Sequence, residues 1–151
     1  MDAERELDQA SLQRLVDESD LRKLVLAYAR FVDARDGDSF GSLFTEDAVF
    51  EVVGFKRVGR KAIAAGPKND FTNRYERTMH YVCNMYFDIE GDEARILAYM
   101  LVPHVPSAAD SARHADAGGW NHMVARRTDK GWLIAEMRAE TVWTAGIPLQ
   151  F

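Results

Sequence analysis

Hydrophobic residues recur at intervals of three and four positions in the first part of the chain, which is the spacing of one face of an α-helix. This stripe consists of Leu21, Leu24, Val25, Tyr28, Ala29 and Val32. Asp17 or Ser19 is suited to cap the start of the helix, and Gly37 is placed to end it. A second, short helix is predicted over residues 38–44, with Asp38 as its cap.

The later part of the chain has the pattern of β-strands. A strand is predicted over 48–53, a short helix between Gly59 and Gly66, and a polar loop over 67–76. Four further strands are predicted at 79–89, 94–102, 120–127 and 132–142. The turns at 90–93 and 128–131 are suited to tight hairpins, so neighbouring strands are expected to be antiparallel. The pattern predicts an α+β fold in which a curved antiparallel sheet wraps around N-terminal helices, with room for a cavity between them.

One connection in this arrangement is long. Residues 103–119 are largely polar, and a loop of that length in a compact domain is either functional or mobile, so it could act as a lid over a pocket. No repeat, linker or low-complexity segment divides the 151 residues. We therefore expect a single domain over 1–151 with its core at about 12–143.

Charge and composition exclude several classes of partner. The net charge of −5 opposes binding to phosphate backbones, and no cluster of Lys or Arg with interleaved aromatics offsets it, so nucleic acid is not an expected partner. No apolar stretch approaches the length that spans a bilayer, which predicts no membrane partner. The acidic N-terminus lacks a signal-peptide pattern and Cys83 is the only cysteine, so we expect a cytoplasmic protein with Cys83 in its core.

The candidate chemistry centres on Asp33 and His80. Asp33 lies four residues beyond Ala29 and eight beyond Val25, so it extends the inward-facing stripe of the first helix. His80 begins a strand that is apolar on both faces, and we expect this strand to be covered on both sides. Alternation along this strand places His80, Val82, Asn84 and Tyr86 on the same face. A carboxylate that holds an imidazole in one tautomer makes a general base near neutral pH.

Other readings of these residues stay open from the pattern alone. Asp33 could be exposed or could bind Arg30 or Arg35, and His80 could be a structural core histidine. His104 follows Pro103 at the exit of a strand, where it could reach the rim of a pocket or be solvated.

The remaining polar candidates and aromatics are easier to place. Asn121 and His122 point to opposite faces of their strand, so only one can face a cavity, and His114 is expected in solvent. The aromatic residues expected in the core are Trp120, Trp132, Trp143, Tyr28 and Tyr86.

Cofactor motifs are not found. No histidine pair has the i, i+4 or HExxH spacing and no cysteine cluster exists, so no metal site is predicted. The chain also lacks a Gly-x-Ser-x-Gly elbow, a phosphate-binding loop and a dinucleotide glycine fingerprint. We therefore expect a protein that works without a cofactor.

From Asp20 to Trp143 the chain resembles the SnoaL-like branch of the nuclear transport factor 2-like superfamily. The segments that carry the resemblance are Tyr28–Asp33 with Asp38, Leu43–Ala48, Arg77–Tyr81 and Gly131–Ile134. Within that branch it is similar to scytalone dehydratase and hexachlorocyclohexane dehydrochlorinase. The resemblance implies a cone-shaped barrel of the nuclear transport factor 2-like or cystatin-like fold, with a ligand cavity inside. It also implies a homo-oligomer, either a dimer or a trimer, in which the tail 147–151 could close the cavity or pack on a neighbour.

The same resemblance implies roles for individual residues. His80 would abstract a proton while Asp33 orients its ring and stabilises the imidazolium. His104 matches the second active-site histidine of the dehydratase, and Asn121 matches its substrate-binding asparagine. The opening segment of the resemblance is common throughout the superfamily and indicates the fold more than the activity, whereas the combination of Asp33 and His80 is more specific.

The chain departs from both enzymes at other cavity positions. Val32 and Val52 stand where the dehydratase has two tyrosines that hold a water near the substrate carbonyl, and Tyr28 stands where the dehydrochlorinase has an active-site lysine. We therefore expect the same machinery with a different substrate, which is contacted by Asn121, Tyr28, Val32 and Val52. The first functional hypothesis is a cofactor-independent lyase, by a dehydratase-like elimination, or an isomerase that acts on a small, cyclic, largely apolar compound. The alternatives are a noncatalytic small-molecule-binding or assembly domain and a polyketide-cyclase-like enzyme.

Overall fold

The computed structural model describes residues 8–71 and 74–150. Its helices are α1 (Gln9–Ala34), α2 (Gly37–Ser42), α3 (Arg60–Ala64) and α4 (Gly66–Phe71), with a 3-10 turn at Ala108–Asp110. Its strands are β1 (Phe44–Val52), β2 (Phe55–Val58), β3 (Arg77–Thr78), β4 (Tyr81–Glu90), β5 (Glu93–Val105), β6 (Ala115–Thr128) and β7 (Gly131–Gly146). Among the described helices, none has the length and apolar character needed to cross a membrane.

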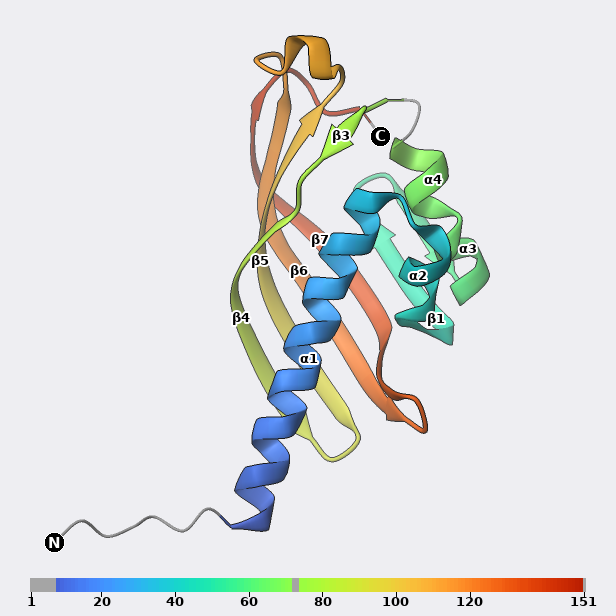
Figure 1. The fold of residues 1–151 in the computed structure, drawn as a ribbon, viewed down its shortest axis with the longest axis vertical. Helices are drawn as coiled ribbons and strands as arrows, with labels where there is room; N and C mark the ends of the chain where they lie inside the picture. Colours follow the sequence, from blue (N-terminus) through green and yellow to red (C-terminus); the bar gives the residue numbers. More distant parts are fainter. Residues whose placement is uncertain (1–7, 72–73, 151) are drawn as a thin grey trace, which may run out of the picture.

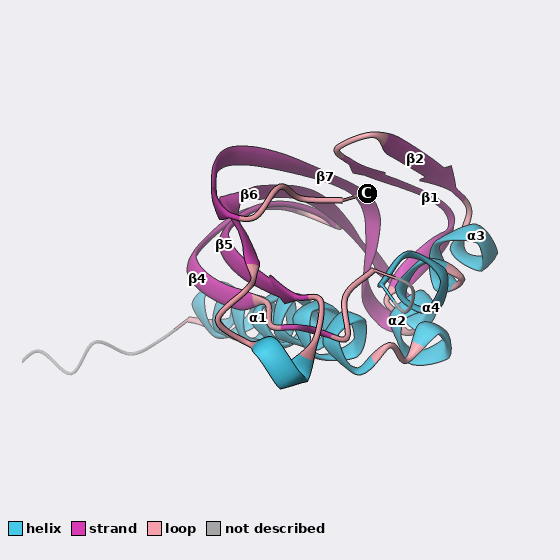
Figure 2. Ribbon diagram, turned by 90° about the horizontal axis from the view of Figure 1, so that it is seen from above, coloured by secondary structure: helices cyan, strands magenta, loops and turns pink. Residues whose placement is uncertain are grey.

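The strands form one strongly curled sheet around the long helix α1 (Figures 1 and 2). Their order is β2-β1-β7-β6-β5-β3, and β4 also pairs with β5. The predicted α+β class is confirmed, and so are both hairpins, which close where Glu90 faces Glu93 and where Thr128 faces Gly131. The sheet is mixed, however, because β1 pairs with β7 in parallel. The antiparallel expectation is wrong for this pair, since a pairing between the first and last long strands involves no hairpin.

The first helix is longer than its apolar stripe predicted. It begins at Gln9, where the Asp8 side chain caps it by accepting a hydrogen bond from the Ser11 N–H. Its first two turns lie at the surface, with Leu12 and Leu15 exposed, so they carry no buried stripe that could reveal them. The helix ends at Arg35 in the left-handed region.

Gly37 and Asp38 do not have the roles that the sequence predicted. Gly37 opens α2 instead of ending α1, and Asp36 caps α2 in place of Asp38. A Cβ atom at Gly37 would collide with the Ala64 carbonyl, so glycine at this position allows α2 to lie against α3.

Strand β4 differs from the prediction because it is an edge strand with a bulge. The ladder to β5 shifts register between Cys83 and Met85, which reverses the alternation of side chains along the strand. Inward-facing residues are consequently Val82, Met85, Phe87 and Ile89. Cys83 is exposed, so its placement in the core was wrong, and Asn84 is also exposed.

The aromatic residues divide between core and surface. Tyr28 and Trp132 are buried as expected, but Tyr86 is 58% exposed and Trp143 46% exposed. Tyr86 lies on the outer side of the edge strand β4, where its ring neighbours that of Tyr99.

Nearly half of the long connection predicted over 103–119 is strand. Strand β5 continues to Val105 and β6 begins at Ala115, so the loop spans only 106–114. Sequence analysis missed the start of β6 because it is rich in glycine, which disfavours strands. A Cβ atom at Gly118 would overlap the Trp143 indole, so glycine there lets β7 pack closely.

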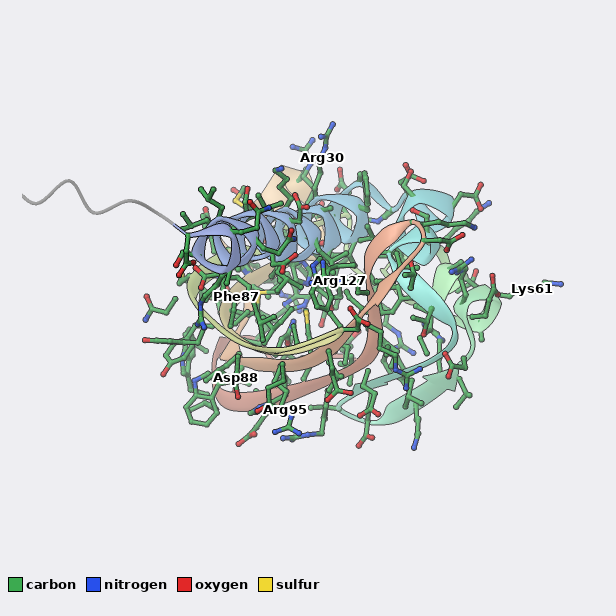
Figure 3. The ribbon with its side chains drawn as sticks, turned by 90° about the horizontal axis from the view of Figure 1, so that it is seen from below. Arg30, Lys61, Phe87, Asp88, Arg95 and Arg127 are labelled. Atoms are coloured by element: carbon green, nitrogen blue, oxygen red, sulfur yellow. The ribbon has the colours of Figure 1, made fainter. Side chains whose placement is uncertain are left out.

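A partly buried ion pair fixes α1 across the sheet. Asp17, predicted as a helix cap, is 4% exposed and accepts hydrogen bonds from both Arg127 amino groups at 2.7 and 2.8 Å and from Trp132 Nε1 at 3.2 Å. The Arg127 guanidinium lies 4.4 Å from the centre of the Trp132 ring, and Figure 3 shows Arg127 beside α1. The hydrogen bonds from Arg127 lower the pKa of Asp17 to about 2, against a partial opposing effect of burial. This contact ties α1 to β6 and β7.

We expect Asp17→Asn to reduce the free energy of unfolding by about 2 kcal/mol at pH 7, because a carboxyl group with a lowered pKa stabilises the folded state when it is ionised. This contribution is fully present above the ordinary pKa of 3.8 and is lost as the pH falls towards about 2. The difference between wild type and Asp17→Asn should therefore shrink by roughly half at pH 3, as measured by urea unfolding. Asp20→Asn, on the exposed side of α1, is the control and should change little. An equal difference at pH 7 and pH 3 would contradict this account.

Candidate active site

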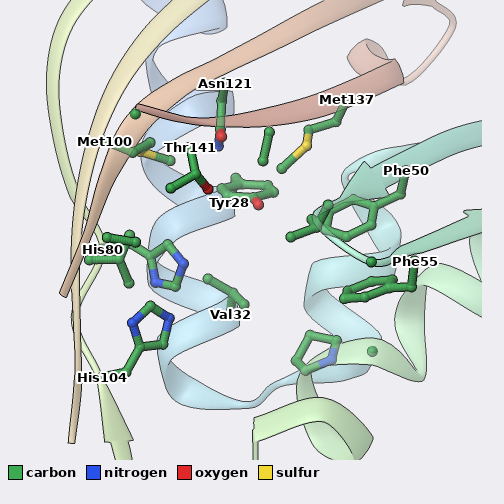
Figure 4. A pocket seen from close by; sticks show the side chains of 18 of the residues that line it. Tyr28, Val32, Phe50, Phe55, His80, Met100, His104, Asn121, Met137 and Thr141 are labelled. Carbon is green, nitrogen blue, oxygen red and sulfur yellow. The ribbon is translucent and has the colours of Figure 1, made fainter. Parts of the chain in front are cut away.

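A cavity of about 440 Å³ lies between α1 and the inner face of the sheet, a size typical of sites for small molecules. Six of the residues that the sequence singled out line it: Tyr28, Val32, Val52, His80, His104 and Asn121. Figure 4 shows His80 and His104 on one side of the cavity and Phe50 and Phe55 on the other. Asp33, the seventh, lies behind His80 and contacts its ring.

Asp33 connects the end of α1 to the start of the β3–β4 segment. Its Oδ1 atom lies 2.6 Å from His80 Nδ1 and accepts a hydrogen bond from the Thr78 hydroxyl at 2.8 Å. Its Oδ2 atom accepts a hydrogen bond from the His80 backbone N–H at 2.7 Å. Because a carboxylate only accepts, Nδ1 of His80 carries the proton in this contact, and the neutral ring then has its lone pair on Nε2.

The environment of Asp33 favours its ionised form. Burial by itself would raise the pKa of Asp33, but the hydrogen bonds from His80 and Thr78, together with the positive charge of a protonated His80 ring, outweigh it, so the pKa lies below its ordinary value. The Arg35 side chain binds the main-chain carbonyl of Asp33 and the Tyr75 carbonyl instead of the carboxylate. Arg30 points away from the molecule (Figure 3). Asp33 is therefore an anion directed at His80.

His104 has a different environment from His80, although both face the same cavity. It is 6% exposed, and its Nδ1 atom lies 3.1 Å from the Ala115 carbonyl oxygen. A carbonyl accepts, so Nδ1 is protonated and Nε2 has the lone pair. Burial, and secondly the positive charge of a protonated His80, lower the pKa of His104. His104 is thus held neutral while His80 is paired with a carboxylate.

The two neighbouring candidates on β6 separate as predicted. Asn121 is 5% exposed and faces the cavity, whereas His122 lies on the outer face of the sheet with its Nε2 atom 3.0 Å from Glu140. His114 is partly exposed and lies 2.7 Å from Asp116, outside the cavity lining.

Sequence analysis missed several residues of this site. Thr78 was not considered, although it precedes His80 by two residues in an extended segment and so points to the same side. The apolar wall opposite His80, which was also missed, contains Phe50 and Phe55. Gln150 also lines the cavity, in the tail that the resemblance implied could close the cavity or pack on a neighbour. Gln150 donates its backbone N–H to the Tyr75 hydroxyl at 2.7 Å, which holds the tail at the cavity. No trio of His, Cys, Asp or Glu with the geometry of a metal site occurs in the described ranges.

We expect Thr78→Val to raise the pKa of Asp33, because the substitution keeps the shape of the side chain but removes a hydrogen bond to the ionised carboxylate. The measurement is a titration of the Asp33 carboxyl carbon by NMR. Thr128→Val is the matched control, since the Thr128 hydroxyl binds the Gly131 carbonyl at a distant turn. An unchanged pKa of Asp33 in Thr78→Val would show that this hydrogen bond does not contribute.

Solved structures share this fold. A protein from Novosphingobium aromaticivorans, provisionally described as an aromatic ring hydroxylase, is 31% identical, covers 88% of this chain and 94% of its own, and has a TM-score of 0.79. A hexachlorocyclohexane dehydrochlorinase from Novosphingobium barchaimii LL02 is 17% identical, with 90% and 93% coverage and a TM-score of 0.80. A second Novosphingobium aromaticivorans protein, provisionally described as a scytalone dehydratase, is 18% identical, with 91% coverage of both chains and a TM-score of 0.77.

Sequence comparison identifies the family. No curated protein sequence matches the chain. The family model of the SnoaL-like domain matches residues 13–138, which include both Asp33 and His80 and most of the cavity wall. This match extends over well more than half of the chain, and the chain belongs to the SnoaL-like domain family.

Proposed function

We propose that this protein is a cofactor-independent lyase or isomerase that removes a proton from carbon in a small, cyclic, largely apolar compound. The observation that carries the proposal is the contact of His80 with Asp33 at the wall of an apolar cavity. A general base must face the substrate and must be held in one tautomer, and this contact supports both conditions.

The proposed step uses the two ring nitrogens of His80 differently. Nε2 accepts the substrate proton, and the positive charge that forms on the ring is balanced by Asp33 at Nδ1. The electron pair of the broken C–H bond then forms a C=C bond. In an elimination a leaving group departs from the next carbon, and in an isomerisation the proton returns at another carbon.

The remaining cavity residues suit this substrate class. Asn121 and the neutral His104 present polar atoms that can position an oxygen of the substrate, while Val32 and Val52 give apolar walls. The cavity lining is predominantly apolar, with phenylalanines facing the histidines, which favours a hydrophobic ring (Figure 4). The names of the dehydrochlorinase and dehydratase neighbours agree with proton removal, although at this identity they bear only on the fold.

The noncatalytic alternative predicted an exposed Asp33 or a His80 without an adjoining cavity. Here the Asp33 side chain is 24% exposed and contacts His80, which lines the cavity, so catalysis is favoured over binding alone. A polyketide-cyclase-like reaction would use the same cavity and is separated from elimination by its product.

We also propose that the protein is a homodimer or homotrimer in the cytoplasm.

The test is exchange of carbon-bound hydrogen from deuterated water into a panel of cyclic ketones and alcohols, including 1-tetralone and 2-cyclohexenone, followed by NMR. We expect His80→Ala and Asp33→Asn each to lower the exchange rate by about 10² to 10⁴, because a positioned general base typically contributes that factor. His122→Ala is the matched control, since this histidine also contacts a carboxylate but lies on the outer face.

Two results would overturn the proposal. The first is exchange at the wild-type rate in both dyad variants, and the second is no exchange by the wild type with any member of the panel. Turnover that requires an added oxidant would point instead to the ring hydroxylation named for the 31% identical neighbour.

A further inference from the structure

Basic residues are concentrated in one segment of an otherwise acidic chain. Residues 54–77, which include β2, α3, α4 and β3, contain seven Lys or Arg and two Asp or Glu. Their net charge of +5 contrasts with −5 for the whole chain, so the other residues together carry −10. Figure 2 shows β2, α3 and α4 on the same side of the curled sheet. Several residues of this segment line the cavity, so the positive charge lies beside it.

Arg57 brings one of these charges to the cavity wall. In β2 it alternates with exposed neighbours and faces the same side as Phe55. Across the ladder it is paired with Phe50 of β1. Its guanidinium lies 4.8 Å from the centre of the Phe55 ring, and all three residues line the cavity. Arg57 has a further interaction in the structure, but the five N–H donors of a guanidinium can serve more than one acceptor.

Arg74 brings a second charge to the same cavity. It is exposed and also lines the cavity, which places it at the opening. No carboxylate in the described part of the chain forms an ion pair with it. Positive side chains at the opening of a cavity with apolar walls attract anions, because the field is focused there. The cavity is therefore more accessible to an anion than the net charge of the chain suggests.

The two sides of the cavity differ in charge. Asp33 lies behind His80 and repels an anion from the histidine side. Phe50 and Phe55 form the other side, as Figure 4 shows, and the Arg57 guanidinium adjoins them. A planar ring that packs on these phenylalanines has room for a negative substituent beside Arg57, while its opposite edge faces His80.

We propose that Arg57 binds a carboxylate group of the substrate and that Arg74 attracts the same group at the opening. The substrate class is then a small cyclic acid whose apolar ring fills the cavity. A guanidinium matches a carboxylate with two parallel N–H···O hydrogen bonds. Because Arg57 is the partly buried member of the pair, it balances one negative charge inside the cavity, which favours a carboxylate over a doubly charged phosphate. This inference rests on the proposed function and narrows its substrate.

The test uses binding, so that it does not depend on turnover. The probe is 2-naphthoate, which is ionised at pH 7, and 2-naphthamide is a neutral ligand of nearly the same shape. We expect wild-type protein to bind 2-naphthoate about tenfold more tightly than 2-naphthamide in a fluorescence titration, as for a hydrogen bond to a charged group. Arg57→Gln should remove this preference and leave 2-naphthamide binding unchanged, which also shows that the variant is folded.

The role of Arg74 is separated from that of Arg57 by salt. We expect Arg74→Gln to slow the association of 2-naphthoate about threefold at low ionic strength, because a charge at the opening attracts the ligand before it binds. This difference should vanish in about 0.5 M salt, which screens exposed charges more than partly buried ones. Stopped-flow fluorescence measures the rates. An equal slowing at both ionic strengths would contradict attraction by Arg74.

Arg95→Gln is the matched control, since it removes the same charge from the exposed face of β5 and should leave 2-naphthoate binding unchanged. The inference is overturned if the wild type binds both ligands equally or neither, or if Arg57→Gln keeps the wild-type preference. Tighter binding of 2-naphthyl phosphate than of 2-naphthoate would overturn the assignment to a carboxylate. Failure of the proposed function is separate, because it would appear as unchanged proton exchange in His80→Ala and Asp33→Asn whatever the naphthoate result.

Discussion

The hydrogen bonds that Asp33 accepts from His80 and Thr78 are the interaction on which the site depends. They join the last turn of α1 to the segment that leads into the edge strand β4, and they fix the His80 ring at the cavity wall. The ion pair between Asp17 and Arg127 supports the same arrangement from the other half of α1, where it ties the helix to β6 and β7. The position of the carboxylate therefore follows from how α1 is held on the sheet, and the orientation of the imidazole follows from the carboxylate.

The cavity combines two histidines with opposite electrostatic surroundings. His80 faces an anion that can balance a positive charge on its ring, whereas His104 faces a carbonyl oxygen in a buried site that lowers its pKa. Protonation of one ring also disfavours protonation of the other, because like charges repel. The two imidazoles therefore differ in their surroundings, although both belong to histidines. The His80 ring is suited to take a proton, whereas the His104 ring stays neutral. Burial also raises the pKa of Tyr28, which lines the same cavity.

Six of the residues singled out from the sequence line one cavity, whereas several elements around that cavity differ from the prediction. The helical period that included Val25, Ala29 and Asp33 placed the carboxylate on the inner side of α1, and the extended pattern around His80 placed the imidazole at a strand start. The bulge in β4 could not be predicted, because side-chain alternation assumes an unbroken ladder, and Cys83 was misplaced for this reason. The parallel pairing of β1 with β7 and the strand at 115–119 depend on contacts between distant segments. Thr78 was missed because a threonine next to a histidine is ordinary until the fold brings Asp33 to it.

The central claim is that Asp33 holds His80 as the tautomer protonated at Nδ1, with Nε2 as the proton acceptor. The most direct measurement is the pair of ring-nitrogen chemical shifts of His80 in ¹⁵N-labelled protein at a pH where the ring is neutral. The account predicts a protonated Nδ1 and an unprotonated Nε2 in the wild type, and a shift towards the other tautomer in Asp33→Asn. A His80 ring protonated at Nε2 in the wild type, or the same tautomer with and without the Asp33 carboxylate, would contradict it.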